Sequence, residues 1–352
     1  MTIPAVVLGA SGYVGGEILR LLGTHPHFRL AAAVSDSRRG DAIADVFPNL
    51  ARTYSGVSFD GPDAWLEKVD KGGDLALFSA APHGASARVI AAALEGAADR
   101  GLDVHVVDSS ADFRYTSAEQ YEAVYGIPHP APALIPEFFC AVPEHAPVPA
   151  DAPHAAHPGC FATAVLLAAV PLLKSGVVNE ELFVSGITGS TGSGRSPQAG
   201  THHPERHSNL YAYKPLLHRH VPEIEALLEA SCQTRASVHF VPHSGPFARG
   251  IYVTMQARMK VPVSSDEVRK AFRSFYEDSE FVNIVDGIPR LKDVIACNDA
   301  RIGVSCEGDT VVVMSAIDNL VKGAAGGALQ WMNRLWSLSE SSGLTAASPA
   351  WT

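Results

Sequence analysis

In the first 110 residues, short apolar runs alternate with stretches in which apolar residues recur at helical spacing. The runs are "AVVL", "FRLAAAV", "DLALFS" and "DVHVVD", and a polar or glycine-containing turn follows each of them. After the first run, Val14, Ile18, Leu21 and Leu22 are spaced as on one face of a helix, and residues 86–95 show a second helical pattern. Strands that alternate with helices predict a parallel sheet with crossover helices, which is an α/β fold of the Rossmann type.

The pattern changes in the second half of the chain. Residues 125–158 are rich in proline and have no period, so we expect a connector or a long irregular loop there. Beyond them, residues 182–188, 237–259 and 308–320 contain strand-like segments. Residues 264–278 predict a helix that begins with a capping pattern, and Leu329, Met332 and Trp336 have helical spacing. This mixture predicts a second domain of the α+β class.

Length and composition limit the kinds of partner. A chain of 352 residues with 47% apolar and 18% charged residues is typical of a two-domain globular protein. The net charge of -10, with no basic run longer than Arg38–Arg39, argues against nucleic acid and anionic membranes as partners. We expect no signal peptide, no membrane span and no metal site. Five cysteines without a C-x-x-C pair fit a reducing cytoplasm.

The turn after the first strand carries a dinucleotide-binding pattern. "GASGYVG" places Gly9, Gly12 and Gly15 between a strand and a helix. Glycines at this place permit a tight turn and let backbone N–H groups approach a pyrophosphate, whereas the alternative is that they only serve the turn. We therefore predict a nicotinamide cofactor, with Ser11, Tyr13 and Val14 as further contacts.

The end of the second strand bears on the choice of cofactor. In "VSDSRRG", Ser35, Arg38 and Arg39 could bind the 2′-phosphate of NADP, because arginine suits phosphate. Asp36 is the kind of residue that instead binds the ribose hydroxyls of NAD. The pattern favours NADP, and the alternative is that the two arginines form a solvated charge pair.

One cysteine stands directly before an apolar helix. In "HPGCFATAVLLAAVPLL", Cys160 would occupy the helix N-terminus, where the macrodipole favours a thiolate. The other four cysteines lack this arrangement. Taken alone, a cysteine is more often buried and inert than reactive, so a nearby acid or base and an anion-binding group are also needed.

Candidate partners of this thiol come from one histidine cluster and two loops. His218 and His220 precede Pro222, which marks a helix start, so we expect both histidines on a fixed loop, where Glu223 could orient one ring. The histidines of "THHPERH" instead suggest a mobile surface segment, and no metal-ligand spacing is present. Residues that could bind a carboxylate or phosphate, unless their loops are only connections, are Ser110 and Arg114 after the fourth strand and Thr188, Ser193 and Arg195 in a glycine-rich loop.

Together these motifs resemble the N-acetyl-gamma-glutamyl-phosphate reductase family, which is related to aspartate-semialdehyde dehydrogenase. The resemblance runs along nearly the whole chain through "GASGYVGGEILRLL", "VVDSSADFRY", "HPGCFAT", "YKPLLHRHVPEI" and "IDNLVKGAAGGALQWMN". It implies that Cys160 is the nucleophile and that a histidine of the His-Arg-His segment is the acid/base, His218 before His220. It also implies NADPH-dependent reduction of a small acyl phosphate through a cysteine thioester.

The same resemblance implies a domain plan and an assembly. Residues 1–157 and a returning segment 320–352 would bind NADP, with Asn319 near the nicotinamide, and residues 158–319 would form the catalytic and oligomerisation domain. A dimer or tetramer is implied. Alternatives are aspartate-semialdehyde dehydrogenase, a lysine-pathway acyl-phosphate reductase, and a non-catalytic nucleotide-sensing protein.

Three positions depart from the family pattern. The family usually has Asn where this chain has His157, glutamine where it has Gly327, and a shorter Ser-Gly-Ala-Gly sequence where it has "TGSTGSGR". None of these departures removes a reacting group. The loop change bears on the acyl group that is accepted.

Overall fold

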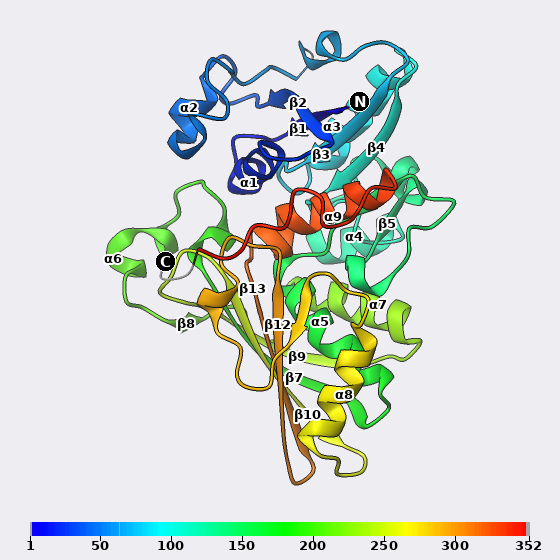
Figure 1. The fold of residues 1–352 in the computed structure, drawn as a ribbon, viewed down its shortest axis with the longest axis vertical. Helices are drawn as coiled ribbons and strands as arrows, with labels where there is room; N and C mark the ends of the chain where they lie inside the picture. The colour runs from blue at the N-terminus through cyan, green and yellow to red at the C-terminus, as the bar shows by residue number, and fades with distance from the viewer. Residues whose placement is uncertain (1, 63, 350–352) are drawn as a thin grey trace. The chain divides into compact units, whose positions relative to one another are not determined.

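Two separate β-sheets organise the chain. The computed structural model describes residues 2–62 and 64–349, which divide into two units (Figure 1). The first unit comprises the described residues up to Ala141, together with Pro147–His157 and Ala324–Thr345. The second unit comprises Val142–Ala146, Pro158–Gly323 and the described residues from Ala346 on. Each unit is considered by itself below.

The first unit is built on a parallel sheet with the strand order β2-β1-β3-β4-β6-β5. All of its strand pairs are parallel, so every connection must cross over the sheet. Helix α1 (Tyr13–Leu22) packs on β1 and β2, and α9 (Gly326–Leu335) packs on β4 and β6. The strands are β1 (Ile3–Leu8), β2 (Phe28–Val34), β3 (Asp74–Ser79), β4 (Asp103–Asp108), β5 (Phe138–Cys140) and β6 (His154–Ala156), and the other helices are α2 (Ile43–Val46), α3 (Ser86–Ala98) and α4 (Ala118–Tyr125).

The central strands of this sheet are buried on both faces. Residues 5–8 of β1 and 75–79 of β3 are all buried, which explains why they are continuous apolar runs rather than alternating ones. Strand β1 lies between β2 and β3, and its glycine turn therefore emerges at the carboxyl edge of the sheet. The α/β prediction for this part of the chain is confirmed.

The proline-rich stretch is not wholly irregular, and that prediction was wrong. Its residues include β5 and β6, which extend the parallel sheet beyond β4. Each has only three residues, too few to show a period of two among the prolines. Strand β6 ends at Ala156, and the backbone N–H of the next residue, His157, donates to the carbonyl oxygen of Asp108 (2.8 Å).

The second unit is built on a mixed sheet with the order β11-β12-β13-β10-β7-β9-β8. Helices α5 (Cys160–Lys174), α7 (His220–Cys232) and α8 (Ser265–Phe275) pack on it or on one another. Ser264 caps α8 through a capping box with Glu267, as its sequence predicted. The strands are β7 (Val178–Thr188), β8 (Tyr211–Ala212), β9 (Ser237–Ser244), β10 (Ile251–Met259), β11 (Val282–Ile284), β12 (Ala300–Glu307) and β13 (Thr310–Ile317), and the long β7–β8 loop holds the short helix α6 (His203–Arg206).

Helix α5 is the core of this unit. Residues 161–172 are all buried, so the helix is apolar on every side and contacts β7, β10 and β13. Such a helix is held by packing along its whole length, and its first residue, Cys160, therefore has a fixed position.

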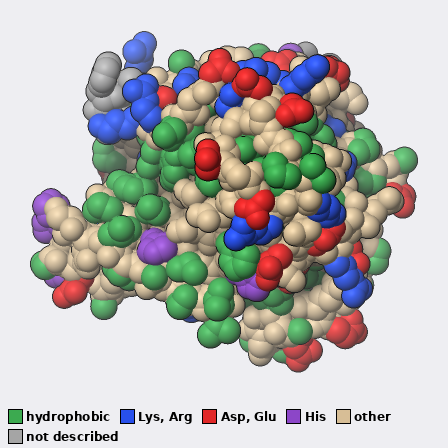
Figure 2. Space-filling model, turned by 90° about the horizontal axis from the view of Figure 1, so that it is seen from below, with side chains coloured by type: hydrophobic (Ala, Val, Ile, Leu, Met, Phe, Trp, Pro, Cys, Tyr) green, Lys and Arg blue, Asp and Glu red, His purple; other side chains and the backbone are tan. Residues whose placement is uncertain are grey.

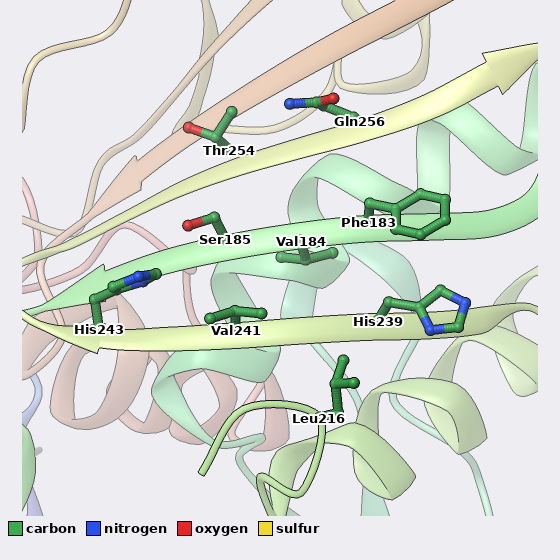
Figure 3. Close-up of a pocket in the computed structure, with 9 residues that line it drawn as sticks. All are labelled: Phe183, Val184, Ser185, Leu216, His239, Val241, His243, Thr254 and Gln256. Carbon is green, nitrogen blue, oxygen red and sulfur yellow. The ribbon is translucent and has the colours of Figure 1, made fainter. Parts of the chain in front are cut away.

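The other face of the second sheet is open in this chain. Along much of β7, β9 and β10, buried residues alternate with residues that are at least partly exposed. This alternation is expected of a sheet that is covered on one side. The open side carries a hollow of about 580 Å³ (Figure 3). Its lining includes Phe183, Leu216, His239, Val241 and His243. On the face seen in Figure 2, hydrophobic side chains lie among basic, acidic and histidine side chains, and the two signs of charge are interspersed.

Candidate functional site

Two glycines of the first turn are required by the packing of the chain itself, and the third is not. Gly9 has a φ of 70°, and a Cβ on it would lie 2.7 Å from the backbone of Ala80. A Cβ on Gly15 would lie 2.6 Å from the Cα of Ala10. A Cβ built on Gly12, the N-cap of α1, would have one described atom within 4 Å outside the adjacent residues, the Gly9 carbonyl oxygen at 3.6 Å. The missing side chain at Gly12 thus fits a pyrophosphate at this helix N-terminus.

A hydroxyl pair joins this turn to the end of β2. The Oγ atoms of Ser11 and Ser35 are 2.8 Å apart. Arg38 and Arg39 follow on the exposed turn, where an Arg38 Nη1 lies 3.4 Å from the Asp41 carboxylate. These residues therefore lie at the carboxyl ends of β1 and β2, where open parallel sheets bind ligands. The remaining residues predicted to contact the cofactor here, Tyr13 and Val14, begin α1.

Cys160 is the first residue of α5. Gly159 is the N-cap, with extended backbone, and the first turn holds no acidic residue. The first turn of α5 therefore adds no negative charge of its own that would oppose a thiolate. The Cys160 side chain is only half-buried.

Glu223 holds the turn before the cysteine. Its Oε1 accepts a 2.6 Å hydrogen bond from the backbone N–H of Gly159, although 64 residues separate the two in sequence. Glu223 is 1% exposed and lies in the first turn of α7. The sequence suggested that Glu223 orients a histidine ring, which stays a prediction; the structure shows its contact with the N-cap of the nucleophile helix.

The two predicted histidines lie beside this turn. The ring centroids of His218 and His220 are 4.7 Å apart, and the Phe161 ring, adjacent to Cys160, lies 5.8 Å from the His218 ring. His220 is the first residue of α7 rather than part of the preceding loop, where we had expected it. The structure thus brings Cys160, His218, His220 and Glu223 to one place in the second unit.

His218 is held as a neutral imidazole. Its Nδ1 accepts the backbone N–H of His220 (3.2 Å), so the ring proton belongs on Nε2. Burial, together with the charges of Arg219 and Lys214, lowers the pKa of His218 to about 4. Near pH 7 its Nε2 is therefore a hydrogen-bond donor.

Sequence reasoning gave no role to three residues around His218. The Tyr213 ring lies edge-on to the His218 ring at 5.6 Å. Burial and then the charge of Cys160 raise the pKa of Tyr213, so its hydroxyl stays protonated near the thiol. Lys214 and Arg219 supply the positive charges next to the same ring. The signal was available in "YAYKPLLHRH", where Tyr213 and Lys214 lie five and four residues before His218.

The glycine-rich loop after β7 is tied to the β9–β10 turn. The Gly189 N–H donates to the carbonyl oxygen of Gly250 (2.9 Å). The carbonyl oxygen of Ala248 accepts two hydrogen bonds from Thr191, one from its N–H (3.0 Å) and one from its Oγ1 (2.6 Å). Asn319 joins both segments, because its Oδ1 accepts Gly250 N–H and its Nδ2 donates to Thr191 Oγ1. The predicted substrate residues of this loop are Thr188, buried at the end of β7, and Ser193 and Arg195, both exposed.

The predicted substrate residues after β4 make many bonds within the first unit. Ser110 Oγ donates to Asp108 Oδ2 (2.6 Å), and Arg114 donates through Nε to the carbonyl oxygen of His157 (3.0 Å) and through Nη2 to that of Ser109 (3.1 Å). Burial raises the pKa of Asp108 to about 6. Ser110 and Arg114 therefore help to shape the carboxyl edge of this sheet.

Two departures from the family pattern meet in the first unit. His157 is 1% exposed, and a Cβ built on Gly327 would overlap its imidazole ring. The ring therefore occupies the space that any side chain at position 327 would need. The unusual histidine and the unusual glycine explain each other.

Among residues 2–62 and 64–349, no group of three or more His, Cys, Asp or Glu side chains is arranged to hold a metal ion. Within the same residues, no helix is both long and apolar enough to cross a membrane.

Family models match both units. Residues 4–137 match the model described as "Semialdehyde dehydrogenase, NAD binding domain", and residues 160–319 match "Semialdehyde dehydrogenase, dimerisation domain". The first unit therefore contains a nicotinamide-nucleotide-binding domain. An aspartate semialdehyde dehydrogenase with NADP from Candida albicans has the same fold, with a TM-score of 0.68 at 16% identity over 96% of this chain and 99% of that chain.

Full-length relatives are much closer in sequence. An N-acetyl-gamma-glutamyl-phosphate reductase of Methanopyrus kandleri is 39% identical over 344 residues, which cover 96% of each chain. The enzyme of the same name from Azotobacter vinelandii is 38% identical over 348 residues and 97% of each chain. The chain therefore belongs to the N-acetyl-gamma-glutamyl-phosphate reductase family, within the semialdehyde dehydrogenases.

Proposed function

We propose that the protein reduces N-acetyl-gamma-glutamyl phosphate to N-acetylglutamate 5-semialdehyde and phosphate with NADPH, as a step of arginine biosynthesis. The observation that carries this proposal is Cys160 at the start of a buried helix, with Glu223 on its N-cap and His218 beside it. The names of the full-length relatives supply the substrate.

The first half of the reaction is acyl transfer to sulfur. The Cys160 thiolate attacks the carbonyl carbon of the acyl phosphate, a C–S bond forms, and the C–O bond to phosphate breaks. The backbone N–H groups at the start of α5 and the Nε2–H of His218 are suited to stabilise the oxyanion of the tetrahedral intermediate. Phosphate leaves, and the acyl group remains as a thioester.

The second half is reduction of that thioester. The nicotinamide cofactor, when bound, supplies a hydride to the carbonyl carbon. The thioester suits this step because it is more electrophilic than an oxygen ester, and Cys160 leaves readily as a thiolate. The hydrogen bond from His218 Nε2 again stabilises the oxygen, and the semialdehyde departs. We assign Arg195, with Ser193 and Thr188, to the phosphate or carboxylate of the substrate, with Ser110 and Arg114 at the edge of the first sheet.

We expect His218→Asn to lower kcat by about 100-fold, the usual scale of losing one hydrogen-bond donor to an oxyanion, and His220→Asn by less than about tenfold. Because the pKa of His218 is lowered to about 4, its ring is mostly uncharged across pH 5–8. The titration of His218 should therefore cause no change of kcat/KM near pH 6.5, and the pH profile of His218→Asn should have the same shape as that of the wild type. Steady-state kinetics across this pH range check both points. The opposite order of the two variants would assign the role to His220.

The cofactor is proposed to be NADP, with its 2′-phosphate at Arg38 and Arg39 and the Ser11–Ser35 pair beside the ribose. The Arg38→Ala/Arg39→Ala variant should raise the KM for NADPH roughly tenfold, as expected for lost charged hydrogen bonds, and leave the KM for NADH nearly unchanged. Arg29, exposed on β2, provides a matched control as Arg29→Ala. A wild-type preference for NADH would instead point to Asp36.

The open face of the second sheet is proposed as the contact with a second copy of the chain. Phe183 is 49% exposed and Leu216 is 58% exposed, and both line the hollow on this face (Figure 3). The matched model for this domain is a dimerisation domain. Sedimentation velocity should find a dimer, or a tetramer built from dimers, and Phe183→Glu should shift it to monomers. A wild-type monomer at micromolar concentration would refute the proposal.

Five free cysteines, one of them the nucleophile, support a reducing cytoplasm as the place of action. Microscopy of the tagged chain checks this point.

The assay for the function itself runs in reverse: NADP⁺ and phosphate are added with N-acetylglutamate semialdehyde, aspartate semialdehyde or a lysine-pathway semialdehyde. Fastest turnover of the first is expected. Preference for another would identify a different reductase, and no turnover by folded protein would favour a nucleotide-sensing role.

A further inference from the structure

The segment that follows β13 contains a single π-helical turn, Val321–Ala325. Gly323 N–H donates to the carbonyl oxygen of Asp318, five residues earlier (3.0 Å). Turns of this kind are rare and frequently lie at functional sites. The residues from Asp318 to Gly323 belong to the second unit, like Cys160.

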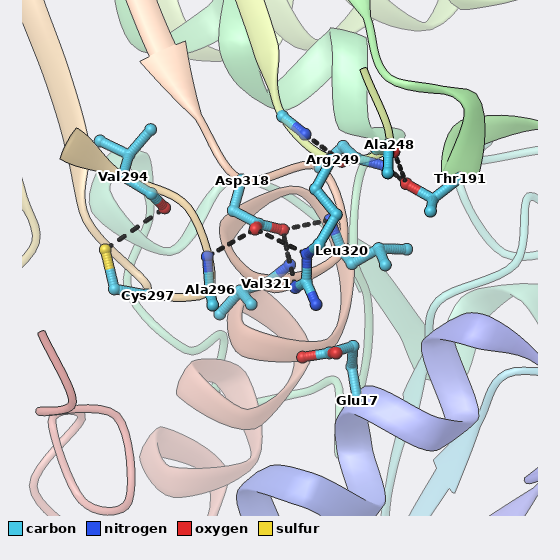
Figure 4. Close-up of polar contacts among 12 residues, drawn as sticks. Glu17, Thr191, Ala248, Arg249, Val294, Ala296, Cys297, Asp318, Leu320 and Val321 are labelled. Atoms are coloured by element: carbon cyan, nitrogen blue, oxygen red, sulfur yellow. Dashed lines mark hydrogen bonds and ion pairs between the residues drawn. The ribbon is translucent and has the colours of Figure 1, made fainter. Parts of the chain in front are cut away.

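Asp318 holds the start of this segment. Its side chain is fully buried, and its two carboxylate oxygens accept five hydrogen bonds (Figure 4). Two come from the guanidinium of Arg249, and the others come from the backbone N–H groups of Ala296, Leu320 and Val321. A buried carboxylate with this many donors rigidly joins the chain before β12, the β9–β10 turn and the segment after β13.

Lys322 holds the π-turn itself. Its side chain is 0% exposed, and its ammonium forms an ion pair with Glu144, whose side chain is 3% exposed. The same Nζ lies 5.4 Å from the centroid of the Phe281 ring. A buried ion pair is costly to desolvate and adds little net stability, so a role in fixing geometry is the more direct explanation for it.

The position that this geometry fixes is next to the nucleophile. A Cβ built on Gly323 would lie 2.8 Å from the Cβ of Cys160 and 3.1 Å from its Cα. The bare backbone of the π-turn is therefore in close contact with the residue that carries the thiol. Nothing larger than glycine fits between them unless one side moves.

We propose that Asp318 and Lys322 are positioning residues for Cys160. They hold the π-turn in place, and the backbone of Gly323 then packs against Cys160 and limits the directions that its sulfur can take. The inference rests on the proposed thioester chemistry for its kinetic consequence. Its structural part, the restraint on Cys160, is measurable without any substrate.

The direct test is Gly323→Ala, with Gly287→Ala as the matched control. Gly287 is exposed in the same unit, and a Cβ there meets no described atom within 4 Å. Displacement of a reacting group by about 1 Å can cost about 100-fold, so kcat of Gly323→Ala should fall on this scale with less than a threefold change in KM. The control should match the wild type.

The reactivity of Cys160 distinguishes positioning of the thiol from a general effect on folding, because loss of stability alone would not change it. Peptide mass spectrometry measures its alkylation by iodoacetamide from pH 5 to 10. In Gly323→Ala, the midpoint of this profile should shift by half a unit or more, while the melting temperature and cofactor binding stay near those of Gly287→Ala. Unchanged alkylation and unchanged kcat would overturn the proposal.

A second variant removes the Lys322–Glu144 ion pair without adding a side chain. Lys322→Met/Glu144→Gln deletes both buried charges together, so that neither is left unpaired. The proposal expects a folded protein with lower kcat, a shifted alkylation profile and partial rescue in Lys322→Arg. If Gly323→Ala does not fold, this variant decides. If the wild type reduces no acyl phosphate but the variants still show these alkylation shifts, the proposed function is refuted and the positioning role is retained.

Discussion

We expect Cys160→Ala to abolish turnover and to leave NADPH binding intact. Both halves of the proposed reaction pass through the sulfur, first as nucleophile and then as leaving group, so no alternative route remains in the variant. Loss of a covalent nucleophile typically lowers kcat by about 10⁴-fold or more. The glycine turn that is expected to bind the cofactor lies in the first unit, whereas Cys160 starts a helix of the second. Steady-state kinetics and fluorescence titration with NADPH measure the two effects.

The covalent step can be seen directly. Wild-type protein given the acyl phosphate without NADPH should gain the mass of one acyl group on the peptide that contains Cys160, and Cys160→Ala should gain none. Cys306→Ala is the matched control, because Cys306 is half-buried in β12 and burial raises the pKa of its thiol. Turnover retained by Cys160→Ala, or lost in Cys306→Ala, would contradict the assignment.

The second large effect is expected at Gly327, far from Cys160 in sequence. Gly327→Gln should destabilise the protein by about 3 kcal/mol or more, since overpacking of a filled core forces side chains and backbone to move. The new Cβ would overlap the His157 ring, which is buried at the carboxyl end of β6. The double variant His157→Asn/Gly327→Gln, which restores the usual residues of the family, should recover most of the stability and activity.

Urea unfolding of the wild type, both single variants and the double variant forms a complete mutant cycle. We expect a coupling free energy near the upper end of the range for contacting residues, about 3 kcal/mol. His157→Asn by itself is the control, because it only leaves space and should cost much less. If Gly327→Gln were as stable as the wild type, the His157 ring would have another place to go, and the two positions would be independent.

Local sequence pattern was sufficient for most secondary structure. The continuous apolar runs of β1 and β3 and the capping box of α8 each depend on residues within one element. The short strands β5 and β6 were missed because three residues carry no period of their own. Their pairing with β4 and with each other decides their structure. His220 was placed in the loop for a related reason, since helix boundaries are weakly encoded.

The glycine turn between a strand and a helix, and the position of Cys160 at the start of an apolar helix, could be predicted from the sequence because both features depend on neighbouring residues. The surroundings of the thiol depend instead on how the chain folds. Glu223 accepts a hydrogen bond from the N-cap residue Gly159, Gly323 packs against Cys160, and the His157 ring occupies the space that a side chain at position 327 would need. The partners in these contacts are far apart in the chain, and no local period encodes them. They arise from close packing, in which the room left by one side chain is decided by segments that meet only after folding.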